Sequence, residues 1–108
     1  MPLLRMSVVR CREGCQVQVG GIFEQLDSHL ATFPGYIMGL HFVSEEHPNV
    51  GEVGRLALWD SREFMDKAAQ DEHTLALRSQ INVLHVSGEH EEHVYTVEGT
   101  PHNLSSGR

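Results

Sequence analysis

The chain has 108 residues and a mass of 12.1 kDa, which is the size of a single domain. Its 8 lysines and arginines against 15 aspartates and glutamates give a net charge of −7 with histidine neutral. This charge argues against binding to nucleic acid or to an anionic membrane surface, because both need clustered cations. The 40% hydrophobic fraction is that of an ordinary folded domain.

The first residues predict no targeting signal, and the spacing of the two cysteines predicts no disulfide. The first residues, MPLLRMSVVRCREG, lack the long apolar run and the small-residue cleavage site of a signal peptide. No apolar run approaches the ~20 residues that a membrane-spanning helix needs. We therefore expect a cytoplasmic protein. Cys11 and Cys15 are expected to be free thiols, because a disulfide between them would close only a very short loop.

The first half of the chain predicts a strand, a helix and a hairpin. Apolar and β-branched residues over 3–12 favour the strand. From Ile22 onward, apolar residues repeat every four positions, which predicts a helix over 22–33 that ends at the following Pro-Gly turn. Two further strands, at 36–44 and 54–60, flank the polar segment EEHPNVGE and predict a hairpin with a long loop.

The second half predicts a helix in two segments and a last strand. Asp60 or Ser61 can cap the first segment and Asp71 the second, because their side chains accept hydrogen bonds from helix N–H groups. Alternating residues over 92–98 predict the strand. The first segment is expected to turn Phe64, Met65, Ala68 and Ala69 inward, and the second contains the apolar residues Leu75, Leu77, Ile81 and Leu84.

The predicted order is β-α-β-β-α-β, the ferredoxin-like α+β fold with a four-stranded antiparallel sheet. The domain spans residues 1–99, and residues 100–108 form a polar tail. Both faces of the first two strands are apolar, but two helices cover only one face of a sheet. We therefore expect a homodimer that pairs sheet against sheet. Strict alternation divides the second strand into two faces, one with Tyr36, Met38, Leu40 and Phe42 and the other with Ile37, His41 and Val43.

Three segments resemble the dimeric α/β-barrel superfamily, and most closely its antibiotic-biosynthesis-monooxygenase type of domain. They are PGYIMGLHF, LALWDSREF and DEHTLAL, and the resemblance covers residues 3–98. It implies that two copies pair as a dimeric α/β barrel. Trp59 and Ser61 match the motif tryptophan and serine, and His73 matches the second histidine of the helical H-x3-H pattern. Ala69 stands at the first histidine position, so that pair is broken.

The resemblance implies a cofactor-independent monooxygenase that acts on an aromatic or quinol-type small molecule with dioxygen, without a bound cofactor or metal. Whether the chain is an enzyme stays open. The alternative is a non-catalytic dimer that binds a small apolar ligand or serves as a scaffold, and a third possibility is an isomerase or cyclase with a histidine proton shuttle. Haem degradation does not match, since the first strand has no asparagine and Arg78 stands near the position of the required histidine.

Cofactor-free oxygenation needs a base near neutral pH and donors for an oxyanion. His73 and His41 are the candidate catalytic residues, because histidine titrates near pH 6.5. His73 could equally be a surface residue, and His41 a hydrogen-bonded core residue. Arg55 has the same strand parity as Trp59, so both should face one side. The candidates for substrate binding are Trp59, Arg55, Tyr36 and Tyr95.

The segment GEHEEHV places two histidines beside carboxylates, which are metal-binding groups. His90 and His93 are three residues apart, and in a strand their side chains point to opposite faces. We therefore expect no metal site there. His29, His47, His85 and His102 are expected at the surface.

Overall fold

The computed structural model describes residues 1–12, 14–45 and 51–99, and the side chains of all of these except 85–89. The predicted polar tail and most of the predicted hairpin loop lie outside the described residues. No helix in these ranges is long and apolar enough to cross a membrane. The elements are β1 (Leu3–Cys11), α1 (Gln16–Leu30), β2 (Tyr36–Val43), β3 (Glu52–Trp59), α2 (Arg62–Gln70), α3 (Glu72–Asn82) and β4 (His85–Thr96).

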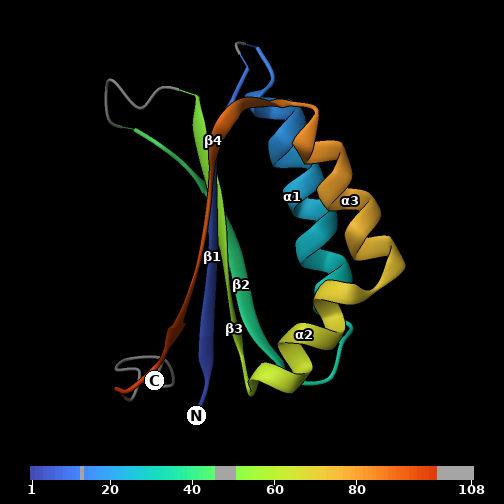
Figure 1. Ribbon diagram of the computed structural model, residues 1–108, viewed down its shortest axis with the longest axis vertical. Coiled ribbons are helices and arrows are strands. Elements are labelled where there is room, and N and C mark those ends of the chain that lie inside the picture. Colours follow the sequence, from blue (N-terminus) through green and yellow to red (C-terminus); the bar gives the residue numbers. More distant parts are fainter. Residues whose placement is uncertain (13, 46–50, 100–108) are drawn as a thin grey trace, which may run out of the picture.

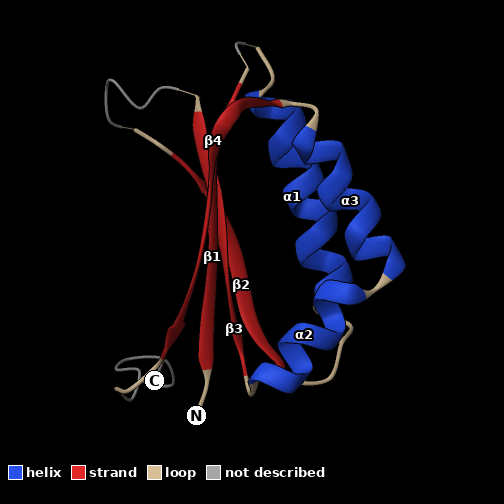
Figure 2. Ribbon diagram, viewed as in Figure 1, coloured by secondary structure: helices blue, strands red, loops and turns tan. Residues whose placement is uncertain are grey.

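The four strands form one antiparallel sheet in the order β2-β3-β1-β4. All three helices lie on one face of it, α1 beside α3 and α2 at one end (Figure 1). The opposite face carries no helix of the described chain, as the view coloured by secondary structure shows (Figure 2). This arrangement confirms the predicted ferredoxin-like α+β fold, with its second helix divided at Asp71 into α2 and α3.

The core lies between the sheet and the three helices. Helix α1 begins six residues earlier than predicted. Its start at Gln16 runs through Gly20 and Gly21, and a glycine inside a helix costs about 1 kcal/mol relative to alanine. Burial of Val19, which is 0% exposed, outweighs this cost. The buried stripe of α1 is Val19, Ile22, Phe23, Leu26 and Leu30.

The cap and the inward face of α3 are both defined in the structure. Asp71 caps the helix as expected, because its carboxylate accepts the backbone N–H groups of His73 and Thr74, both at 3.1 Å. The helix orientation turns Thr74 and Leu77 inward, at 2% and 1% exposure, and leaves Leu75 51% exposed. Of the apolar residues in this segment, Leu77 therefore belongs to the core and Leu75 does not.

The register of β2 against β3 shifts between Tyr36 and Met38, so that Tyr36 pairs with Trp59 and Met38 with Leu58. The extra residue turns Tyr36 to the helix side, where its ring meets the Trp59 ring edge-on at 5.3 Å. Gly39 makes room for it, because a Cβ there would lie 2.1 Å from the Tyr36 hydroxyl. The prediction that Tyr36 shares a face with Met38 is wrong, since it assumed unbroken alternation.

Strand β4 begins at His85, seven residues before the predicted start. It pairs with β1 from Leu3↔Thr96 to Cys11↔His85, with a register shift near its first residues. The early part of this strand is polar, so alternation of apolar residues could not mark it. Pairing with a buried neighbour, and not its own pattern, makes this segment a strand.

The side of the sheet without helices, called the helix-free face below, is apolar on three of its strands. The paired residues alternate with the buried positions of β1 and β3, and place one set of side chains on this face. Phe42 lies across Gly54, where a Cβ would be 2.5 Å from the ring. The apolar members of the helix-free face are Leu4, Met6, Val8, Met38, Leu40, Phe42, Leu56, Leu58 and Tyr95.

Two leucines on α3 test the orientation of this helix. Leu77→Ala removes a fully buried side chain, and we expect it to lower the free energy of unfolding by about 2–5 kcal/mol. Leu75→Ala makes the same chemical change on the exposed side, and should change it by less than about 0.5 kcal/mol. Urea denaturation measures both. Equal losses for the two variants would contradict the orientation described here.

Candidate functional site

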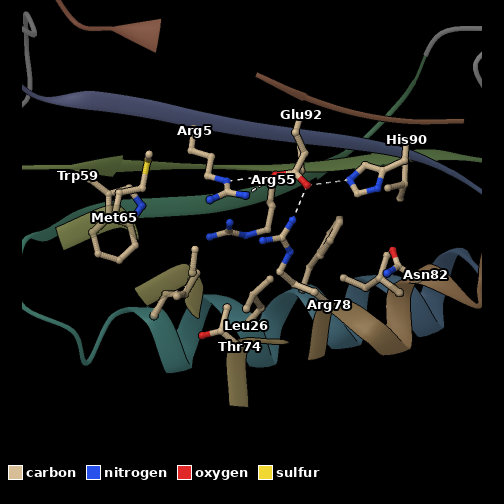
Figure 3. Close-up of a pocket in the computed structure, with 16 residues that line it drawn as sticks. Arg5, Leu26, Arg55, Trp59, Met65, Thr74, Arg78, Asn82, His90 and Glu92 are labelled. Atoms are coloured by element: carbon tan, nitrogen blue, oxygen red, sulfur yellow. Dashed lines mark hydrogen bonds and ion pairs between the residues drawn. The ribbon is translucent and has the colours of Figure 1, made fainter. Parts of the chain in front are cut away.

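A cavity of about 250 Å³ lies between the sheet and the helices. Strands β1, β3 and β4 form one side of it, and α1, α2 and α3 form the other (Figure 3). Its apolar wall includes Phe23, Leu26, Trp59, Met65 and Ile81. Its polar wall includes Arg5, Ser7, Arg55, Arg78, His90 and Glu92. The cavity therefore has the composition of a small-molecule site, with apolar walls and a few polar groups.

Arg55 is the most buried charged side chain of the cavity, with the residue 5% exposed. It lies on the same side of β3 as Ala57 and Trp59, both buried, as the strand parity predicted. Its Nε donates to Asp27 Oδ1 on α1 at 2.8 Å. Its Nη2 is buried and has no hydrogen-bond partner among the described residues. A buried donor left unpaired costs about 1–3 kcal/mol, so this nitrogen is a strong site for an acceptor.

Glu92 on β4 binds two further arginines of the cavity. Arg5 Nη2 lies 2.5 Å from Glu92 Oε1, and Arg78 Nη2 lies 2.5 Å from Oε2. Burial raises the pKa of the Glu92 carboxyl, but the hydrogen bond from Arg5 and the charges of Arg5 and Arg78 outweigh burial, and the pKa is lowered. Glu92 is therefore ionised at neutral pH and neutralises part of the positive charge of the cavity. His90 Nε2 lies 3.4 Å from Glu92 Oε2.

The aromatic candidates lie in three different places. Trp59 lines the cavity and is 2% exposed. Tyr36 packs behind it and does not line the cavity; burial, helped by the charge of Asp27 and opposed by that of Arg55, raises the pKa of its hydroxyl. Tyr95 lies on the helix-free face, 46% exposed, with its ring stacked 6.0 Å from that of His93. The sheet separates Tyr95 from the cavity.

The two predicted catalytic histidines do not line the cavity. His41 Nδ1 lies 3.1 Å from Asp27 Oδ2, so His41 is connected to Arg55 through Asp27. His73 is an exposed residue in the first turn of α3, and its ring meets that of His29 edge-on at 4.5 Å. The structure thus brings together Arg55 and Trp59, and leaves His73 apart from them.

His29 is only partly exposed, contrary to the expectation of a surface residue. Its Nε2 lies 2.7 Å from Asp71 Oδ2, which joins α1 to the cap of α3. The hydrogen bond from His29, followed by that from the Thr74 backbone, lowers the pKa of Asp71. Of the other histidines expected at the surface, His47 and His102 lie outside the described residues, as does the side chain of His85.

Sequence reasoning missed Arg5, Arg78, His90 and Glu92 as members of the site. A signal existed for Arg5, because it has the strand parity of Leu3 and Val9, which are both buried. His90 could not be found this way, because it precedes the strand predicted over 92–98, whereas Glu92 is the first residue of that predicted strand. The expected divergence of His90 and His93 is confirmed, since they pair with Val9 and Met6 on opposite faces. In the described part of the chain, no three His, Cys, Asp or Glu side chains form a group that could hold a metal ion.

No protein-family model matches the sequence, and a comparison with curated proteins finds no match. Solved structures do match. Rv0793 from Mycobacterium tuberculosis has a TM-score of 0.80 at 15% identity, over 93% of this chain and 98% of that one. SnoaB from Streptomyces nogalater, a cofactor-independent oxygenase, has a TM-score of 0.74 at 15% identity, over 92% of this chain and 95% of that one.

A structure described as an antibiotic biosynthesis monooxygenase matches with a TM-score of 0.72 at 18% identity, over 92% of this chain and 99% of that one. Identities this low establish the fold and not the activity. The chain therefore has the fold of the antibiotic-biosynthesis-monooxygenase type of domain, as the resemblance in its sequence predicted.

The lowered pKa of Glu92 predicts how its contribution to stability depends on pH. Because the folded-state pKa lies below the ordinary value of 4.5, ionised Glu92 stabilises the fold fully above pH 4.5 and loses this effect as the pH falls through the folded-state value. Glu92→Gln should therefore lower the free energy of unfolding near neutral pH, and the deficit should shrink in acid. Urea denaturation across pH measures it, with Glu91→Gln on the opposite face as control. A deficit independent of pH would contradict the ion cluster.

Proposed function

We propose that the protein is a cofactor-independent monooxygenase that acts on an aromatic, quinol-type small molecule with dioxygen. The observation that carries the proposal is that Arg55 and Trp59 line the same cavity, with Arg55 Nη2 buried and unpaired among the described residues. The fold supports it, since it is shared with SnoaB, which is a cofactor-independent oxygenase.

The proposed chemistry takes its electrons from the substrate. A bound anthrone, for example, loses a proton from its CH₂ group, and the resulting enolate reduces dioxygen. One oxygen atom becomes the new carbonyl of the quinone, and the other leaves as water with the two hydrogens of the CH₂ group. The protein must exclude water and stabilise the oxyanion. Trp59 and Phe23 supply apolar walls, and Arg55 Nη2 supplies the donor.

We assign the role of proton acceptor to His90. His90 lines the cavity, whereas His41 is connected to it only through Asp27 and Arg55. Glu92 lies 3.4 Å from His90 Nε2 and would stabilise an imidazolium there. His73 remains the candidate that the sequence resemblance implies. Substituting His73 and His90 one at a time distinguishes between the two candidates. An isomerase or cyclase would use the same proton acceptor without consuming oxygen.

We further propose that two copies associate through the helix-free face. This surface is contiguous and apolar over β1, β2 and β3, and apolar sheet surfaces of this kind are association sites. A two-fold pair buries the same surface on both copies, which is the commonest way in which soluble chains cover such a face.

Oxygen uptake with a panel of anthrones and hydroquinones tests the proposed reaction. We expect oxygen uptake by the unaltered protein. In Arg55→Met the rate should fall about 10²–10³-fold, because the oxyanion loses its hydrogen-bond donor. In His90→Gln it should fall about 10²–10⁴-fold, because the proton acceptor is removed. Arg62→Met, at an exposed position of α2, is the matched control and should retain the activity.

Two results would overturn parts of this proposal. One result is that no compound of the panel causes oxygen uptake while Trp59 fluorescence shows that a compound binds. The chain would then be the non-catalytic ligand-binding protein that the sequence analysis gave as the alternative. If His73→Ala removes the activity and His90→Gln does not, the proton acceptor is His73.

The oligomeric state has its own test. Sedimentation equilibrium should give a mass of twice 12.1 kDa. Leu40→Glu, which places a charge on the helix-free face, should dissociate the pair. Val83→Glu makes the same change at an exposed apolar residue just after α3 and should not. A mass of 12.1 kDa for the unaltered protein at micromolar concentration would contradict the dimer.

A further inference from the structure

We infer that the ligand of the cavity is a planar aromatic acid that enters as a preformed monoanion, with its carboxylate accepting hydrogen bonds from Arg55. The inference rests on the cavity being the substrate site of the proposed function. It adds the charge of the ligand, which the proposed reaction leaves open, since a neutral quinol would become an anion only during turnover.

The first support is the state of Arg55 in the protein itself. Its side chain is 6% exposed, and the bond from Nε to Asp27 fixes the plane of the guanidinium group. Nη2 belongs to a side chain that lines the cavity, and it is buried without a partner among the described residues. A carboxylate oxygen placed at Nη2 would form a charge-assisted hydrogen bond, which is about twice as strong as a neutral one.

The second support is the balance of charge. The guanidinium groups of Arg5, Arg55 and Arg78 converge on the same space (Figure 3). Two carboxylates of the described chain face them, Glu92 between Arg5 and Arg78, and Asp27 beside Arg55. With His90 uncharged, three cations face two anions. One negative charge completes the set, so the cavity favours a monoanion over both a neutral molecule and a dianion.

The third support is the apolar wall, which sets the shape of the ligand. Trp59 and Phe23 line the cavity together with Arg55, and each has an aromatic ring against which another ring can pack. A carboxylate attached directly to an aromatic ring system would place its oxygens at the guanidinium groups and its rings against these walls. The volume of about 250 Å³ is large enough for a two-ring acid.

The net charge of the whole chain opposes the binding of an anion. The effect of salt on binding therefore distinguishes a ligand in the cavity from an anion on exposed arginines. A net charge of −7 repels anions at long range, and salt screens that repulsion beyond the Debye length of ~8 Å at physiological ionic strength. Contacts inside the cavity are screened much less. Salt should therefore not weaken the binding of the acid, whereas binding of an anion to exposed arginines would weaken steadily as salt is added.

Calorimetric titration with a matched pair of ligands tests the inference on the unaltered protein. The pair is 2-naphthoate and 2-naphthamide, which have similar size and differ in charge. We expect the naphthoate to bind about tenfold more tightly or better, since one charge-assisted bond to Arg55 contributes on the order of 1.4 kcal/mol. Equal affinities, or no binding of either ligand, would overturn the inference.

A double variant then locates the preference. Arg55→Met with Asp27→Asn removes both charges of the pair, so that neither is left buried alone, and circular dichroism confirms the fold. This variant should bind naphthoate and naphthamide equally, and Arg62→Met should keep the preference. A preference that survives in the double variant places the carboxylate elsewhere and refutes its assignment to Arg55.

The result is independent of the proposed reaction, because neither ligand has a CH₂ or hydroquinone group to oxidise. A retained preference for naphthoate in a protein that consumes no oxygen would sustain the acid-binding site and refute the oxygenase. Oxygen uptake by a protein that binds the two ligands equally would support the oxygenase and refute the acid-binding site.

Discussion

The ion pair between Arg55 and Asp27 is the constraint on which the site depends. It joins β3 to α1 across the core, at 2.8 Å between Nε and Oδ1, with both side chains largely withdrawn from water. A guanidinium group this buried needs a carboxylate partner, because an isolated charge there would cost several kcal/mol. Asp27 accepts the hydrogen bond of Nε and leaves Nη2 buried without a partner among the described residues. The pair thus holds the helix on the sheet and orients the donor that a ligand would meet.

The strand parity of β3 made this part of the site predictable, and the same rule failed where strands depart from regularity. Trp59 and Arg55 share a face because side chains alternate along a strand. Asp71 caps α3 because its carboxylate accepts hydrogen bonds from the first N–H groups of the helix. Tyr36 lies on the opposite face from its prediction, because one extra residue in β2 reverses the alternation. Bulges depend on how two strands meet, which a single sequence does not display.

The polar half of the cavity was hidden for a different reason. Glu92 and His90 belong to a strand whose early part has no apolar alternation, and Arg78 belongs to a helix whose inward face the sequence pattern did not define. Each residue looks like a solvated surface group in the sequence. They become a site only because β1, β4 and α3 meet, which brings Arg5 and Arg78 to one carboxylate. Long-range packing, and not local pattern, creates this cluster.

The abundance of histidine acquires a structural explanation from these contacts. His29, His41 and His90 each lie against a carboxylate, of Asp71, Asp27 and Glu92 respectively. Each of these imidazole groups therefore has a carboxylate as its partner, and each contact joins two different elements of the fold or two neighbouring positions of β4. At two of them the carboxylate is the one that holds a cavity arginine. Asp27 and Glu92 thus each hold a histidine and an arginine at once, so the positions of Arg55 and Arg78 depend on carboxylates that His41 and His90 also contact.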